Sequence, residues 1–159
     1  MVSGGHGRQR TTDAVLAAVL RDRPAVYAHL AAAHDAAWRA VDPVLLELCR
    51  LRIAVLLGCD AERSVRTPVA KRAGLDEAAV SALSQWPSSP RFGARERACL
   101  AFCEQFVIDV AGMADDLALD VAHHLGATGL RDLAAGLLVL EQRQRLRLAV
   151  EALDLPGVT

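Results

Sequence analysis

The sequence predicts an all-α protein, and its composition gives the reasons. Apolar residues make up 53% of the 159 residues, yet aromatic residues make up only 4%. Alanine and leucine dominate the apolar fraction, and they are the best helix formers among apolar residues. The β-branched and aromatic runs that are typical of strands are sparse. A chain of this length suits one domain with a sizeable core, so we expect a compact single-domain bundle of about seven helices.

The first half of the chain contains the start and stop signals of three helices. A threonine at position 11 or 12 can cap the first of them. Pro24 and Pro43 each suit a first helical turn, and Asp42 can cap the strongly apolar third helix, which Gly58 ends. These signals predict helices over about residues 12–21, 24–40 and 43–57.

The second half begins with an interrupted helix. Asp60 can cap a helix that Gly74 ends, but Pro68 inside it predicts a kink or break near Arg66. Asp76 caps a short helix, and the segment PSSPRFG that follows it is the clearest loop in the chain. The remaining signals predict helices over about residues 77–86, 94–111, 114–125 and 128–153, with Gly126 separating the last two.

Charge and hydropathy exclude two classes of partner. The 18 Lys and Arg and the 19 Asp and Glu are mixed and give a net charge of −1, so no basic field favours nucleic acid. No apolar run approaches the roughly 20 residues of a membrane span. The apolar run at residues 14–20 loosely resembles a signal peptide but fits an amphipathic helix, so we expect a cytoplasmic protein. The Gly-rich segment 1–10 is predicted to be flexible, and residues 11–155 to form the domain.

Cys59 is the first candidate for chemistry. A helix that begins at Asp60 would bring free N–H groups and the positive end of its dipole to the sulfur, which lowers the pKa of a thiol. Arg63 and Arg66 would add positive charge, whereas Asp60 and Glu62 would oppose it. The alternative, which local physics favours, is a small buried residue of the core, because free cysteine is among the most buried residue types.

Glu47 is the second candidate, since it is a carboxylate in an otherwise apolar helix. It is either paired with Arg50 one turn later, or a buried acid with a raised pKa that can move protons. Both interpretations stay open from the sequence.

Other reactive residue types have ordinary explanations. Cys99 and Cys103 lie among apolar residues at helical spacing, which favours core packing. The histidines lack the spacing that a helical metal pair needs, so we predict neither a metal site nor a cofactor. On the last helix, Arg143 and Arg147 share a face and flank Arg145. They form either an anion-binding edge or, as the sequence favours, a solvated or subunit-contact face.

Two long segments carry a family resemblance. Residues 41–75, VDPVLLELCRLRIAVLLGCDAERSVRTPVAKRAGL, and residues 89–110, SPRFGARERACLAFCEQFVIDV, occur in the order expected of one family. The chain resembles the carboxymuconolactone decarboxylase family, which includes the alkyl hydroperoxidase D-like proteins, over roughly residues 25–153. The resemblance implies an alkyl hydroperoxidase D-like helical fold and assembly as a homo-oligomer, either a dimer, a trimer or a hexamer.

The resemblance also assigns four candidate site residues. The peroxidase branch of the family uses Glu-x11-Cys-x2-Cys-x3-His, and Glu47 and Cys59 match its relay acid and its resolving cysteine. Glu62 stands where the attacking cysteine is expected, and Arg66 stands where the relay histidine is expected. A dithiol cycle is therefore not expected, because Glu cannot replace a sulfur and Arg cannot act as a base near neutral pH.

Three functions follow from this comparison. The first is a divergent family member with at most a residual peroxiredoxin-type thiol activity through Cys59. The second is a small-molecule-binding or lyase-like protein that uses Glu62 and Arg66. The third is a non-catalytic oligomeric member of the fold.

Overall fold

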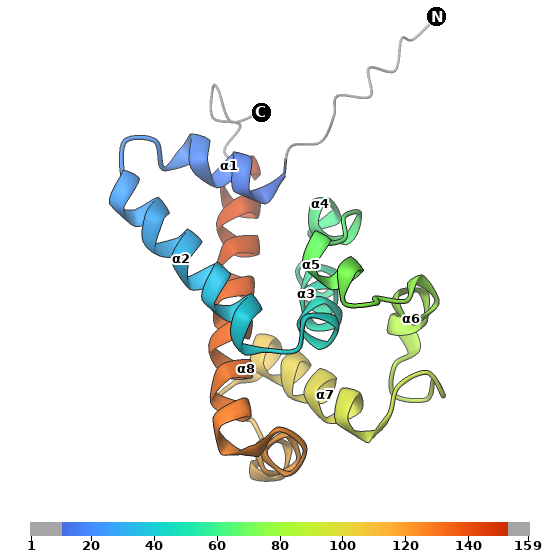
Figure 1. The fold of residues 1–159 in the computed structure, drawn as a ribbon. Helices are drawn as coiled ribbons and strands as arrows, with labels where there is room; N and C mark the ends of the chain where they lie inside the picture. Colours follow the sequence, from blue (N-terminus) through green and yellow to red (C-terminus); the bar gives the residue numbers. More distant parts are fainter. Residues whose placement is uncertain (1–10, 153–159) are drawn as a thin grey trace, which may run out of the picture.

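The computed structural model describes residues 11–152, and every regular element in that range is a helix (Figure 1). The all-α prediction is confirmed. The predicted flexible segment 1–10 and the last residues of the predicted domain lie outside the described residues. The elements are α1 (Thr12–Val19), α2 (Pro24–Ala40), α3 (Pro43–Leu57), α4 (Asp60–Arg63), α5 (Pro68–Arg72), α6 (Glu77–Ala82), a 3₁₀ turn (Leu83–Gln85), α7 (Ala94–Asp109) and α8 (Asp115–Ala152).

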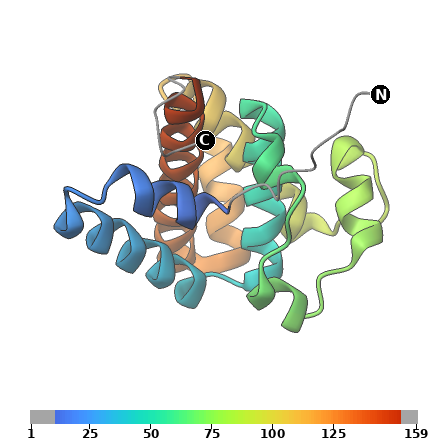
Figure 2. The ribbon, with the colours of Figure 1, turned by 90° about the horizontal axis from the view of Figure 1, so that it is seen from above.

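Helices α3, α7 and α8 enclose the main core. The long helix α8 packs against α2, α3 and α7, and α3 also packs against α7. Figures 1 and 2 show α1 lying across the C-terminal half of α8. Helices α4, α5 and α6 lie on the side of α3 that faces away from α8. Fully buried leucines from the three core helices meet between them, including Leu46, Leu100, Leu133 and Leu137. One face of the C-terminal half of α8 is therefore covered by α1 rather than by solvent.

The ends of α3 follow the predicted signals. The side chain of Asp42 accepts a hydrogen bond from the backbone N–H of Leu45 at 2.9 Å, and Pro43 occupies the first turn. Gly58 ends the helix in the left-handed conformation, with φ of 70°. This conformation suits glycine because a Cβ atom would crowd the carbonyl. These local signals set where α3 begins and ends, and so which residues its length presents to the core.

The predicted break near Arg66 separates two short helices. Thr67 caps α5 by accepting a hydrogen bond from Ala70, and Pro68 starts that helix instead of kinking a longer one. The predicted cap at Asp60 is wrong by one residue, because Cys59 occupies the N-cap position of α4. The extended backbone between α4 and α5 leaves polar backbone groups that α3 can bind.

The helix α8 is broken where the sequence predicts. Gly126 has φ of 74° and ψ of 168°, so two helical segments meet there. Near the start of the second segment, the hydroxyl of Thr128 accepts a hydrogen bond from the guanidinium of Arg131. Within residues 11–152, no helix is long and apolar enough to cross a membrane.

Candidate functional site

A cavity of about 200 Å³ lies where the start of α1, the middle of α2 and α3, the break between α4 and α5, and the C-terminal half of α8 meet. Most of the residues that line it are polar or charged, but apolar atoms form the larger part of the wall surface, with Ala61, Val65, Pro68 and Leu140 among the apolar lining residues. The polar residues of the wall are Thr11, Thr12, Asp13, His34, Arg50, Glu62, Arg66, Thr67, Arg143, Gln144 and Arg147.

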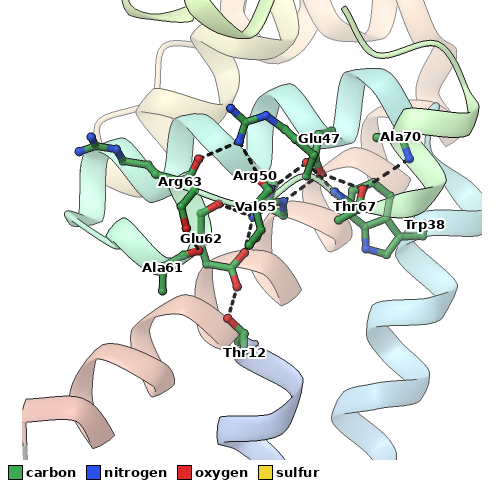
Figure 3. Close-up of polar contacts among 12 residues, drawn as sticks. Thr12, Trp38, Glu47, Arg50, Ala61, Glu62, Arg63, Val65, Thr67 and Ala70 are labelled. Carbon is green, nitrogen blue, oxygen red and sulfur yellow. Dashed lines mark hydrogen bonds and ion pairs between the residues drawn. The ribbon is translucent and has the colours of Figure 1, made fainter. Parts of the chain in front are cut away.

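Glu47 and Arg50 form a buried ion pair behind this cavity (Figure 3). The guanidinium donates from Nε to Oε2 at 2.9 Å and from Nη2 to Oε1 at 2.8 Å. Thr67 adds two more bonds to the same carboxylate, from its backbone N–H and its hydroxyl, each at 3.0 Å. The pairing with Arg50 that the sequence offered as one interpretation is therefore present, and the carboxylate is fully buried.

Arg50 connects α3 to the break between α4 and α5. It donates to the backbone carbonyls of Glu62 at 2.9 Å and Val65 at 2.8 Å, and to the carboxylate of Glu62. Burial opposes its charged form, but the hydrogen bonds and charge of Glu47, together with Glu62, outweigh it and raise the pKa of Arg50. The sequence identified Arg50 only as a partner of Glu47.

Glu62 lies on the wall of the cavity, as the second sequence hypothesis requires. One of its carboxylate oxygens pairs with Arg50, and the other accepts a hydrogen bond from the hydroxyl of Thr12 on α1. Figure 3 shows Glu62 between these two residues. Because Thr12 lies fifty positions earlier in the chain, this contact could not be anticipated from local sequence.

Arg66 also lines the cavity, but its guanidinium is already engaged by other groups of the protein. Its guanidinium contacts Glu77 at 3.3 Å and donates to the backbone carbonyls of Arg63 and Val65. The structure therefore places Glu47, Glu62 and Arg66 around one region, with Arg50 as the link between the first two.

The C-terminal half of α8 supplies a second set of charges. Arg143 and Arg147 are 5% and 2% exposed, so the expected solvated or subunit-contact face is wrong for these two residues. They are buried because α1 packs over them, with Arg143 pairing with Asp13 and Arg147 donating to the hydroxyl of Thr12 at 3.0 Å. Arg145 points away, with a side chain 55% exposed.

Gln144 lies between these arginines on the cavity wall. Its Nε2 donates to the backbone carbonyl of Arg50 at 3.0 Å, which defines the orientation of the amide because a carbonyl can only accept. Its Oε1 is buried and has no hydrogen-bond partner among the described residues. The α-helical period groups Leu140, Arg143, Gln144 and Arg147 within about 100° of arc, which is the signal that sequence analysis could have used.

His34 contributes from α2. The indole N–H of Trp38 donates to its Nε2 at 2.9 Å, so the neutral ring carries its proton on Nδ1. Burial, followed by the charge of Arg143, lowers the pKa of His34 and outweighs the opposite effect of nearby acids. A neutral imidazole therefore lines the cavity.

Cys59 does not line this cavity, and its environment does not activate it. The residue has no exposed surface and packs with Ala54, Ala61 and Leu148. Burial raises the pKa of the thiol, although a contact with the backbone of Glu62 acts in the opposite direction. This environment does not favour the activated thiol considered from the helix N-terminus, and Cys59 is the buried residue that local physics favours.

The other three cysteines belong to the core between α3 and α7. The thiol of Cys103 contacts the backbone carbonyl of Cys49 at 3.7 Å. Hydrogen bonding to Cys103 and burial raise the pKa of Cys49 well above its usual value, and burial raises the pKa of Cys99 to about 12. The prediction that Cys99 and Cys103 pack in the core is confirmed. In the described part of the chain, no cluster of three or more His, Cys, Asp or Glu could hold a metal ion.

Comparisons with known proteins agree on the family and the fold. The profile of the "Carboxymuconolactone decarboxylase family" matches residues 24–105, just over half of the chain. A crystal structure of an Agrobacterium tumefaciens protein of unknown function, suggested to be the antioxidant defence protein AhpD, superposes with a TM-score of 0.72. The two sequences are 18% identical, and the match covers 84% of this chain and 93% of the Agrobacterium chain. This likeness supports the alkyl hydroperoxidase D-like fold alone. No curated protein matches the chain.

Proposed function

Because the chain belongs to the carboxymuconolactone decarboxylase family, we propose that it binds a small carboxylate in the cavity between α1, α3 and α8. The observation that carries this proposal is the pair of buried guanidinium groups, Arg143 and Arg147, on the cavity wall. Guanidinium groups match the geometry of a carboxylate and bind it through paired hydrogen bonds.

The acids that accompany these arginines leave room for a ligand. The side chains of Asp13 and Glu151, which pair with Arg143 and Arg147, are 63% and 39% exposed. An ion pair is weaker when its carboxylate is exposed to water than when both charges are buried. A ligand carboxylate inside the cavity would be shielded from water, so it can replace Asp13 as the partner of Arg143.

The apolar part of the wall limits the rest of the ligand. A cavity of roughly 150 Å³ can hold one benzene molecule, so a space of about 200 Å³ fits a carboxylate with a single small ring or short chain. Val65 and Leu140 offer contacts to such a group.

A lyase-like reaction in this cavity would use Glu62 to transfer a proton. Glu62 is a carboxylate on the cavity wall, and general acid–base chemistry requires such a group within reach of the ligand. In this proposal Arg143 and Arg147 hold the ligand, while Glu62 and Arg66 complete the opposite wall.

The geometry favours this function over the two alternatives. A residual peroxidase activity needs a thiolate that peroxide can reach, whereas Cys59 is buried and its pKa is raised. A non-catalytic scaffold would fill the region beside Glu62 and Arg66 with apolar side chains, whereas a cavity with charged residues in its wall lies there.

Calorimetric titration with phenylacetate tests the proposal. We expect saturable binding of phenylacetate and none of the neutral analogue benzyl alcohol. Arg143→Gln and Arg147→Gln should each weaken binding at least about tenfold, since each removes a charged hydrogen bond. Arg145→Gln is the matched control, because this arginine lies on the same helix but outside the cavity.

Two further results complete the test. Glu62→Gln should bind phenylacetate at least as tightly as the wild type, because the substitution removes a negative charge beside the ligand. The proposal is wrong if the wild-type protein binds neither phenylacetate, benzoate nor propionate at millimolar concentration.

A further inference from the structure

Gln144 carries a buried hydrogen-bond acceptor that the fold does not use. Its side chain is 1% exposed, and its Nε2 is engaged by the backbone carbonyl of Arg50. Rotating the amide would place Oε1 against the backbone carbonyl of Arg50, so that two acceptors would face each other. Oε1 therefore cannot exchange places with Nε2. Buried side-chain acceptors normally have a donor, and one without a donor is a site where a ligand can supply it.

The position of this acceptor relates it to the proposed carboxylate site. Gln144 stands one residue after Arg143 and one turn before Arg147, and all three residues line the same cavity. A ligand whose carboxylate meets the two arginines therefore has its neighbouring atoms beside Gln144.

We infer that the ligand of this cavity is a small hydroxycarboxylate whose hydroxyl group donates a hydrogen bond to Oε1 of Gln144. This inference rests on the proposed function, because the two arginines must hold the carboxylate. The carboxylate itself cannot satisfy Oε1, since an ionised carboxylate only accepts. A second, neutral donor on the same molecule is required.

The surrounding charges disfavour an ammonium group as that donor. The wall has four arginines and two acids, so a further cation would meet a net positive charge; these residues are Arg50, Arg66, Arg143, Arg147, Asp13 and Glu62. A hydroxyl group donates without bringing a positive charge. The site thus favours a hydroxy acid over the corresponding amino acid.

Mandelate and phenylacetate form the decisive pair of probes, because they differ only in the hydroxyl group next to the carboxylate. We expect at least one enantiomer of mandelate to bind the wild-type protein about tenfold or more tightly than phenylacetate, as measured by calorimetry at constant ionic strength. Phenylglycine, in which an ammonium replaces the hydroxyl, should bind more weakly than mandelate.

The variant Gln144→Met retains the length of the side chain and removes the acceptor. It should bind mandelate and phenylacetate with equal affinity, while its affinity for phenylacetate stays within about threefold of the wild type. Thermal unfolding checks that the variant is folded. The comparison of the two probes on the wild-type protein tests the inference even if the variant is not.

The outcomes separate this inference from the proposed function. If neither probe binds, the proposed carboxylate site is wrong and the inference is wrong with it. If both bind equally well to the wild type, the carboxylate site stands and the inference is overturned, because water then satisfies Gln144. If phenylglycine binds as tightly as mandelate, the assignment of a neutral donor is overturned.

Discussion

Glu47 and Arg50, one turn apart on α3, form an ion pair in which both carboxylate oxygens accept hydrogen bonds from the guanidinium. The side chains are 0% and 3% exposed, so water satisfies neither charge. Thr67 and the carbonyl of Val65 use remaining positions on the two groups. The pair therefore joins α3 to α4, which carries Glu62, and to the break after it, which carries Arg66.

Removing one member of this pair should be strongly destabilising. Glu47→Gln leaves the charge of Arg50 buried and only partly compensated by Glu62, so we expect the free energy of unfolding in urea to fall by about 3 kcal/mol. Arg63→Gln is the control, because Arg63 and its partner Asp60 are exposed. That change should cost no more than about 0.5 kcal/mol. An equal effect of the two substitutions would contradict a structural role of the buried pair.

Cys59 should resist oxidation by peroxide. Its thiol is buried and its pKa is raised, so little thiolate is present near neutral pH. After treatment with stoichiometric peroxide at neutral pH, mass spectrometry should find no preferential sulfenic acid at Cys59, and Cys59→Ser should consume peroxide at the wild-type rate. Oxidation should accelerate in the alkaline range, where the thiol ionises, and in urea. Rapid and selective modification of Cys59 at neutral pH would restore the redox hypothesis.

The helices could be predicted because their signals are local. Asp42, Pro43 and Gly58 act within one turn of the ends of α3, and Gly126 breaks α8 by its own backbone conformation. Such signals depend on neighbouring residues alone, so the sequence contains them in full.

The cavity could be predicted only in part because long-range contacts build it. Glu47, Glu62 and Arg66 were indicated by spacing and by family resemblance. The burial of Arg143 depends on Asp13, which lies 130 positions earlier in the chain. The helical period places Arg143 and Arg145 on different sides of α8, but no local pattern shows which side α1 will cover.

A side chain at Gly126 should destabilise the fold. Its φ of 74° and ψ of 168° lie in a region that only glycine populates, although nothing lies within 4 Å of the position of a Cβ atom. The cost is therefore conformational, and we expect Gly126→Asn to lower the free energy of unfolding by about 1–3 kcal/mol. Gly58→Asn is the matched comparison, because its φ of 70° and ψ of 28° form the left-handed helical conformation that asparagine also adopts. It should cost less than Gly126→Asn in the same urea titration, and the reverse order would contradict this explanation.

His34 should make the protein less stable as the solution becomes mildly acidic. Burial and Arg143 lower its pKa in the folded state below the usual 6.5, against the opposing charges of Asp13, Asp35 and Glu62. Between pH 6.5 and that lower pKa the unfolded chain binds more protons than the folded one, so the free energy of unfolding falls as the pH falls. Above pH 6.5 the ring is neutral in both states and contributes no pH dependence.

Urea unfolding measured from about pH 7.5 to about pH 5 checks this contribution. His34→Gln should have a smaller slope of unfolding free energy against pH than the wild type, because it removes the group that charges on unfolding. His29→Gln, on the same helix but outside the cavity wall, should keep the wild-type slope. Protonation of His34 also costs the hydrogen bond that its Nε2 accepts from Trp38. The acid-dependent loss should therefore persist in Asp35→Asn, and its disappearance there would assign it to the surface carboxylate instead.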